Sequence, residues 1–249
     1  MRPSERPEIR DLPLFRTMRD DSFDTLAKDF FARDFPPGFD LLRQGDPARV
    51  LHIVLDGAVL LYTRHRGRET TTAVVEPTGS FILAACIRDA PYLVSARTLE
   101  RARVVLVPCE QLRSIVRQDP DFALAVAEEL SGCIRQVVRH TKNLKLRNAQ
   151  ERLAAYLLRE SRLCGDADRF ILPVEMRTLA SFLGMMPETL SRSMRSLEAA
   201  GIAKEGARAI RITDRDALAR LAAPDALIDG PGPVGTSRGI DLPGVRAAS

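Results

Sequence analysis

The chain has 249 residues, of which 45% are hydrophobic and 28% charged, and its formal net charge is +4 at pH 7. This size and composition predict a soluble globular protein of one or two domains, and the small positive charge is a weak hint of an anionic partner. No apolar run reaches the ~18 residues of a membrane span, and the first residues lack the apolar core of a secretory signal. The four cysteines, Cys86, Cys109, Cys133 and Cys164, form no CxxC pair, so we expect a reducing cytoplasm and no membrane partner.

The first half of the chain changes from a helical to a strand-like pattern. Residues 9–31 carry apolar side chains at helical spacing and predict a helix that packs on the following domain. From Phe35 to Pro108, short apolar runs alternate with turns rich in Gly, Pro and Asp. Many short strands at regular spacing indicate a β-sandwich or jelly roll. The expected strands are residues 50–55, 58–62, 71–75, 80–83 and 104–107.

A long helix is predicted to connect the two halves. Asp119 can cap it, Pro120 suits its first turn, and only Gly132 interrupts the pattern before Leu146. Its apolar residues alternate at spacings of four and three, which is typical of a coiled-coil seam. The predicted seam residues are Val126, Leu130, Cys133, Val137, His140 and Leu144. We expect the seam to pair two copies of the chain, and the alternative is a helix that lies on its own β-domain.

Residues 178–201, TLASFLGMMPETLSRSMRSLEAAG, predict two short helices around a tight turn. Gly184 provides backbone freedom at the turn, and Pro187 suits the first turn of the second helix. The second helix has an apolar stripe on one face and polar or cationic residues on the other. The candidate DNA-reading residues on the polar face are Glu188, Thr189, Ser191, Arg192 and Arg195. Arg can bind guanine, Glu can accept from cytosine, and Ser or Thr can hold phosphate.

The regions around this motif complete a domain plan. An amphipathic helix over residues 150–160 is expected to begin the DNA-binding domain, and strand-like runs at 202–204 and 209–212 predict a hairpin that makes the motif a winged helix. Beyond Ala222 the chain is rich in Gly and Pro, and we expect a disordered tail. The predicted domains are a sensor domain (1–118), a dimerisation helix (119–147), a winged helix-turn-helix domain (148–223) and the tail (224–249).

The run FPPGFDLLRQGDPARVLHIVLDGAVLLY resembles the opening of a cyclic-nucleotide-binding fold. Joined to the winged helix, residues 10–222 resemble the CRP/FNR family of bacterial transcription regulators. That resemblance implies an α+β protein, with a jelly roll, a dimerisation helix and a winged helix, that binds double-stranded DNA as a homodimer and contacts RNA polymerase. Glu188, Ser191 and Arg192 form an E-x-x-S-R pattern that resembles the FNR-type subgroup, which implies palindromic operators with half-sites related to TTGAT.

The resemblance also bears on the ligand. In relatives that bind cyclic AMP, a Gly-Glu pair and a following Arg-Ser hold ribose and phosphate, whereas here Leu83 and Ala84, then Tyr92 and Leu93, stand at those positions. A buried phosphate needs cationic or N–H donors, so cyclic AMP is not expected. With Phe81, these four residues form a predicted sensor pocket for an apolar or planar ligand, or for haem in nitric oxide or oxygen sensing.

Other cofactors and other functions are less well supported by the sequence. The first cysteine is Cys86, so an iron–sulfur cluster of the FNR type is not expected. Candidate haem ligands are His52, His65, His140 and Cys86, each of which also has an explanation in packing or loop structure. No catalytic triad, phosphate loop or metal-ligand spacing indicates an enzyme. The alternative to a DNA-binding regulator is a ligand-binding interaction module that keeps the fold without reading DNA.

Overall fold

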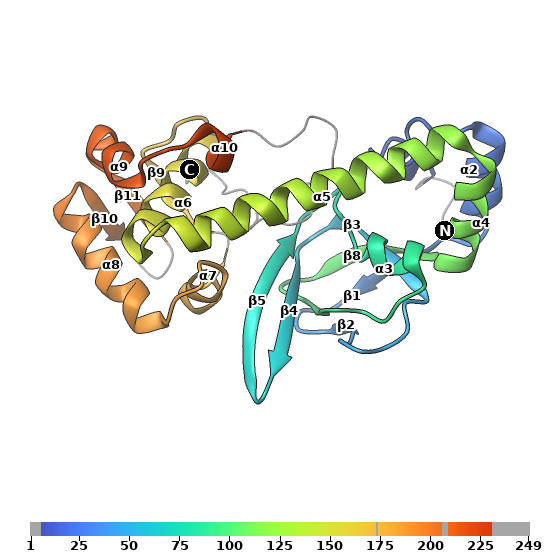
Figure 1. Ribbon diagram of the computed structural model, residues 1–249, viewed down its shortest axis with the longest axis horizontal. Coiled ribbons are helices and arrows are strands. Elements are labelled where there is room, and N and C mark those ends of the chain that lie inside the picture. Colours follow the sequence, from blue (N-terminus) through green and yellow to red (C-terminus); the bar gives the residue numbers. More distant parts are fainter. Residues whose placement is uncertain (1–5, 173, 206–208, 231–249) are drawn as a thin grey trace. The chain divides into compact units, whose positions relative to one another are not determined.

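The computed structural model describes residues 6–172, 174–205 and 209–230. The chain divides into two compact units, one up to Gln136 and one from Val137 onward, with the boundary inside the long helix α5 (Figure 1). No helix in the described part of the chain is long and apolar enough to cross a membrane.

The first unit contains two four-stranded antiparallel sheets. One sheet has the order β1-β8-β3-β6, formed by Phe31–Phe35, Ala102–Pro108, Val50–Asp56 and Ser80–Phe81. The other has the order β2-β7-β4-β5, formed by Asp40–Leu42, Ser95–Thr98, Val59–His65 and Arg68–Val75. Gly57 joins β3 to β4 with φ +80°, and a Cβ there would lie 2.3 Å from the carbonyl oxygen of Arg101, so no larger residue fits.

Apolar side chains from both sheets form the core of this sandwich, which includes Val54, Val59, Leu61, Ala73, Val75, Phe81, Tyr92, Ala96 and Val104. A second core lies between the β1-β8-β3-β6 sheet and a helical layer. That layer is formed by α1 (Arg6–Arg10), α2 (Asp20–Ala27), α3 (Leu83–Arg88), α4 (Cys109–Gln118) and the first part of α5 (Pro120–Leu146). Phe15, Phe23, Phe30 and Phe122 are fully buried in it.

The prediction of one helix over residues 9–31 was wrong. The structure has the two helices α1 and α2 with a turn between them, because Pro13 lacks an N–H and disfavours helical geometry before it. Arg10 stabilises this turn by donating to the carbonyl oxygens of Phe15 and Met18, the latter at 2.6 Å. Phe31 begins strand β1, which pairs with β8.

The strand predictions in the middle of the sandwich were confirmed, with shifts of a few residues at their ends. The strand expected at 80–83 stops at Phe81, because Ile82 adopts a left-handed conformation (φ +64°) and α3 begins at Leu83. The sequence analysis did not predict β1, β2 and β7: β1 and β2 are short and largely exposed or partly buried, and β7 is a four-residue strand with three buried residues.

Helix α5 begins at Pro120, as predicted. The buried carboxylate of Asp119 accepts hydrogen bonds from the backbone N–H groups of Asp121 and Phe122, both at 3.1 Å, and from that of Arg19 at 2.9 Å. These bonds satisfy N–H groups that a helix start otherwise leaves free.

The second unit is built around helix α6 (Ala149–Leu163), which begins with a capping box between Asn148 and Glu151. The other helices are α7 (Met176–Phe182), α8 (Pro187–Ala199), α9 (Arg215–Ala222) and α10 (Ala226–Asp229). Strands β9 (Arg169–Ile171), β10 (Ile202–Glu205) and β11 (Ala209–Ile212) form a sheet with the order β10-β11-β9. The predicted hairpin is therefore present, and β9 adds a third strand to it.

The segment after α9 corrects the prediction of a disordered tail for residues 224–230. Asp225 caps α10 by accepting from the N–H of Leu227 at 2.7 Å. Asp229 forms a two-pronged ion pair with Arg147, with N–O distances of 2.7 and 2.5 Å. Gly and Pro content alone did not reveal these polar contacts. The rest of the predicted tail, residues 231–249, lies outside the described residues.

Candidate DNA interface, sensor core and dimer helix

The turn between α7 and α8 is fixed by backbone geometry and by one arginine. Gly184 has φ +63°, and the N–H groups of Gly184 and Met185 bind the carbonyl oxygens of Ser181 and Ala180 at 3.1 and 3.0 Å. This pattern ends α7 in a Schellman motif, which requires a left-handed residue at the position of Gly184. Arg152 of α6 donates to the carbonyl oxygens of Leu183 at 2.9 Å and Arg147 at 2.7 Å.

Arg152 is a residue that the sequence reading missed. It lies on an amphipathic helix, where a charged side chain usually faces solvent, and its partners are up to 31 residues away in the sequence. No local pattern therefore marks it. Its bonds hold the end of α7, where the turn toward α8 begins, to α6.

Helix α8 has a buried face and an exposed face. Leu190, Met194 and Leu197 are at most 3% exposed and pack into the core of the unit. On the other face, four of the five candidate DNA-reading residues are exposed: Glu188, Ser191, Arg192 and Arg195. The fifth, Thr189, is partly buried, and its hydroxyl accepts a hydrogen bond from Arg192 at 3.4 Å.

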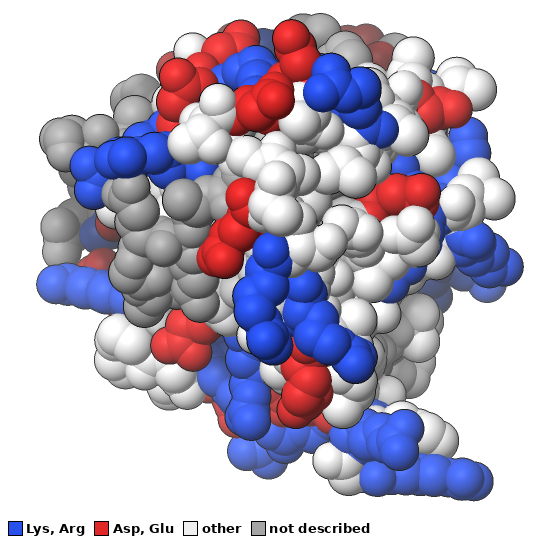
Figure 2. Space-filling model, turned by 90° about the vertical axis from the view of Figure 1, so that its left-hand side faces the viewer, with Lys and Arg blue, Asp and Glu red and all other residues white. Residues whose placement is uncertain are grey.

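The exposed face of α8 has a shape and a charge that suit contact with an anionic ligand. Pro187, Glu188, Ser191, Arg192 and Arg195 line an open depression of about 480 Å³. Within the described ranges, neither arginine of this face has a carboxylate partner, so their charge is available to a ligand. Figure 2, which looks from the side on which α8 is drawn, shows Lys and Arg side chains clustered near the centre of the visible face.

Exposed arginines on neighbouring elements extend the positive charge. Arg177 lies on α7, Arg169 on β9 and Arg211 on β11. A short helix with an exposed polar and cationic face, backed by a packed core, can enter the major groove of B-form DNA.

Comparison with known proteins agrees with this geometry. Residues 151–221 match the Crp-like helix-turn-helix domain, and residues 32–119 match the cyclic nucleotide-binding domain. The chain is 30% identical over 217 residues to the transcriptional activator protein anr of Pseudomonas aeruginosa, covering 85% of this chain and 88% of that protein. The chain belongs to the CRP/FNR family of transcription regulators.

Two further relatives show the breadth of the family. The CRP-like cAMP-activated global transcriptional regulator of Mycobacterium tuberculosis is 23% identical to this CRP/FNR regulator, over 84% of the chain and 96% of the relative. The structure of FixK2 from Bradyrhizobium japonicum is 26% identical, with a TM-score of 0.68, and the match covers 79% of this chain and 99% of that one. The Pseudomonas aeruginosa and Mycobacterium tuberculosis relatives are transcription regulators by name, and the chain, as a member of their family, is a transcription regulator and not an enzyme.

The five residues of the predicted sensor pocket are not brought together. Phe81 and Tyr92 pack inside the sandwich, and the Tyr92 hydroxyl donates to the carbonyl oxygen of Val50 at 3.2 Å. Leu83 lies in the second core, while Ala84 is exposed and Leu93 is 81% exposed. Helix α3 begins at Leu83, so neighbouring residues of this segment point into different surroundings.

A cyclic nucleotide would need a cation for its phosphate, and the sequence indicates Arg88 and Arg97 as candidates. Arg88 is exposed in the last turn of α3. Arg97 is engaged by Asp40 at 3.0 Å and by the Tyr62 hydroxyl at 2.9 Å, and the hydrogen bond from Arg97 holds the pKa of Asp40 below its usual value.

The candidate haem ligands lie at four separate places. His52 is 5% exposed, stacks on Phe81 with ring centroids 5.1 Å apart, and has its pKa lowered to about 4 by burial. His65 is exposed at the end of β4, and His140 packs on Phe182 in the second unit at 5.0 Å. Cys86 lies in the second core of the sensor domain. Across the described ranges, no group of three or more His, Cys, Asp and Glu could hold a metal ion.

The residues of the predicted dimer seam differ in their exposure within the chain. Val126 is 4% exposed in the second core, Leu130 packs against that core, and Cys133 is partly buried. His140 packs on Phe182, and Leu144 lies beside Gly184. Only Val137, at 52%, is well exposed.

A neighbouring stripe on α5 is exposed instead. Leu124, Ile134 and Val138 are 60%, 65% and 53% exposed. With Ala127 and Ser131, they also alternate at spacings of three and four, about 100° around the helix from the predicted seam. The sequence carries two adjacent stripes of the same period, and the one predicted as the seam mostly packs within the chain. We call residues 124, 127, 131, 134 and 138 the outer stripe.

Proposed function

We propose that this CRP/FNR regulator binds a palindromic operator with TTGAT-related half-sites as a homodimer and contacts RNA polymerase from that site. The proposal rests on the exposed face of α8, where Glu188, Ser191 and Arg192 stand together and where, among the residues that the structure describes, Arg192 has no ion-pair partner. In this proposal Arg192 and Glu188 read bases, Ser191 and Thr189 position the helix, and Arg195 binds phosphate. The protein would act in the cytoplasm, where its DNA is.

The outer stripe of α5 supports the homodimer. Leu124, Ile134 and Val138 are large aliphatic side chains on a continuous helix, and a second copy of the same helix offers a matching apolar surface around a two-fold axis. A palindromic operator requires the same symmetry. We therefore assign residues 119–147 to dimerisation, residues 1–118 to sensing and residues 148–223 to DNA binding.

We also propose that the sensor domain does not bind cyclic AMP. The support is the lack of an available cation at the positions of Leu83, Ala84, Tyr92 and Leu93, and the tight apolar core around Phe81. An apolar or planar ligand, or haem, remains the alternative signal. An ultraviolet-visible spectrum of the purified protein, with and without added haem, tests the haem version through the Soret band.

The operator proposal is tested by measuring binding to a labelled TTGAT palindrome and to a scrambled duplex by fluorescence anisotropy. Replacing Arg192 with Ala should cost about 1–3 kcal/mol on the palindrome, or about 5- to 150-fold in affinity, with little change on the scrambled duplex. Arg220→Ala is the matched control, because Arg220 is also exposed but lies on α9. Equal affinity of the wild type for both duplexes, together with no effect of Arg192→Ala, would favour an interaction module that does not read DNA.

A further inference from the structure

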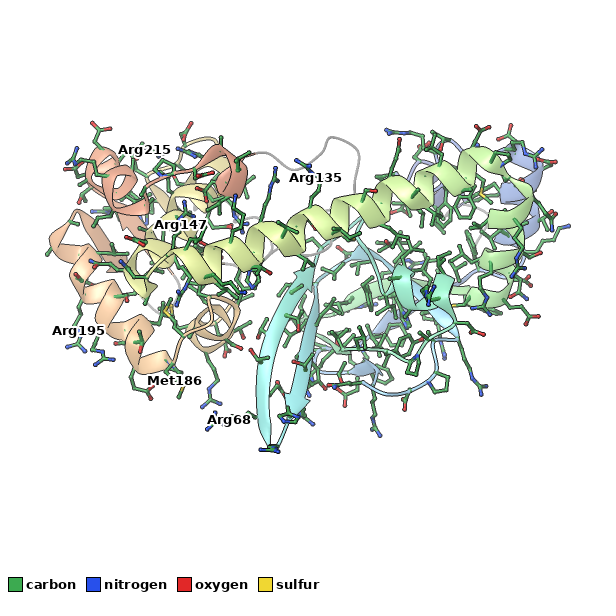
Figure 3. All side chains as sticks on the ribbon, viewed as in Figure 1. Arg68, Arg135, Arg147, Met186, Arg195 and Arg215 are labelled. Atoms are coloured by element: carbon green, nitrogen blue, oxygen red, sulfur yellow. The ribbon has the colours of Figure 1, made fainter. Side chains whose placement is uncertain are left out.

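The start of the reading helix carries an exposed apolar side chain that the proposed function does not yet use. Met186 immediately precedes α8 and is 67% exposed, whereas the apolar residues Leu190, Met194 and Leu197 of the same helix are buried. Figure 3 shows Met186 at the end of α8 that adjoins α7, with Arg195 farther along the same helix. Met186 therefore contributes little to the core of the unit.

Met186 also does not stabilise the helix start. It occupies the N-cap position of α8, where Ser, Thr, Asn or Asp would accept a hydrogen bond from the helix, and its side chain makes no such bond. The starts of α6 and α9 in the same unit have Asn148 and Asp214 as side-chain caps. Residues that depart from the usual packing and capping preferences are expected at functional sites. Met186 neither packs in the core nor caps the helix, and it lies beside the candidate recognition face.

The position of Met186 suits contact with bases. The N-terminal residues of a recognition helix reach base edges in the major groove, and Met186 stands two positions before Glu188 and next to Pro187, which lines the depression on α8. The C5-methyl group of thymine is the apolar group that the major-groove edge presents. Methionine is long, flexible and polarisable, so it can follow such a surface.

We propose that Met186 is a specificity residue that packs on the C5-methyl group of a thymine in the half-site. This inference rests on the proposed function, because it requires α8 to lie in the major groove. It adds a discrimination that Glu188, Ser191 and Arg192 do not provide, since those side chains read polar base edges.

The test removes the thymine methyl group alone. Each thymine of the TTGAT palindrome, on both strands, is replaced in turn by deoxyuridine, and affinities are measured for the wild type, Met186→Ala and Met186→Leu. The wild type should lose about fourfold in affinity when either of two symmetry-related thymines is replaced, the loss that corresponds to one methyl group. Met186→Ala should bind the unmodified operator more weakly and show no further loss at those positions, whereas Met186→Leu should keep most of the sensitivity.

The outcomes separate this inference from the proposed function. The wild type and Met186→Ala could lose affinity equally at every deoxyuridine position while the wild type still prefers the palindrome over scrambled DNA. That result would overturn the role of Met186 and leave operator binding intact. Wild type without any preference for the palindrome would overturn the proposed function first. Thermal unfolding of Met186→Ala serves as a folding control, and an unchanged midpoint is expected because the side chain is mostly exposed.

Discussion

Replacing Ile134 with Glu is the sharpest test of the outer stripe. The Ile134 side chain is 65% exposed in the single chain, and a dimer that uses the stripe would bury it in both copies. Full burial of one such side chain contributes about 1.5–3 kcal/mol, so burial of the exposed two-thirds in two copies contributes about 2–4 kcal/mol. The substitution also places two carboxylates near the two-fold axis. The dimer dissociation constant should therefore rise by about 30- to 1,000-fold.

Sedimentation equilibrium over a wide range of protein concentration measures this constant directly. Gln136→Glu is the control, because it introduces the same side chain and the same change of charge at a position that is not buried and lies about 200° around the helix from Ile134. Near-normal dimerisation is expected for the control. An unchanged dissociation constant for Ile134→Glu, or a wild type that stays monomeric at every concentration, would refute the reasoning.

Two other predictions concern the second unit. Asp229→Asn should lower the free energy of unfolding by about 2–3 kcal/mol near pH 7, less than for a fully buried pair, because the Asp229 side chain is 19% exposed and that of Arg147 is 6% exposed. Burial alone would raise the pKa of Asp229, but the hydrogen bonds from Arg147 outweigh it and hold the pKa below its usual value. The difference in free energy of unfolding between wild type and variant, measured by denaturant titration, should therefore be fully present above about pH 4 and should disappear as the pH falls through the lowered pKa of Asp229. A difference that does not vary with pH would contradict this account. Gly184→Ala should cost about 1–2 kcal/mol from its left-handed backbone, and its Cβ would lie 2.7 Å from a methyl group of Leu144, which has to move. A thermal midpoint equal to that of the wild type would show that the turn tolerates a side chain.

The winged helix was predictable because its signals are local. Gly184 marks the turn, Pro187 marks the first turn of α8, and Leu190, Met194 and Leu197 follow the period of a helix with one buried face. All of these signals span only a few residues, so they can be recognised in the sequence without knowledge of tertiary contacts. The exposure of the polar face then follows from burial of the apolar one.

The apolar stripe of α5 that remains exposed was not predictable in the same way. Val126 and Ile134 both belong to stripes with spacings of three and four, and both stripes satisfy the coiled-coil pattern. The choice between them depends on where the second core of the sensor domain lies, and that core is formed by residues far away in the sequence, such as Phe15 and Leu112. Periodicity indicates that a helix has an apolar face, but it does not indicate which surface covers that face.

The positions of the predicted pocket residues could not be read from the sequence for a related reason. Phe81, Leu83 and Ala84, then Tyr92 and Leu93, come from two short apolar stretches, and helix α3 distributes the side chains of the first stretch over the two cores and the surface. The bond between Tyr92 and Val50 is also a tertiary contact across 42 residues, which no local pattern reveals.

A buried hydrogen bond links the β-sandwich to helix α5. Phe81 of β6 lies in the sandwich core and stacks on His52. The residue before it, Ser80, donates a buried hydrogen bond of 3.1 Å to Glu129 of α5. Glu129 and Ile134 lie on the same helix, so this bond joins β6 to the element that carries the outer stripe. One face of α5 is therefore held to the sandwich, while another face remains exposed for the pairing that we propose.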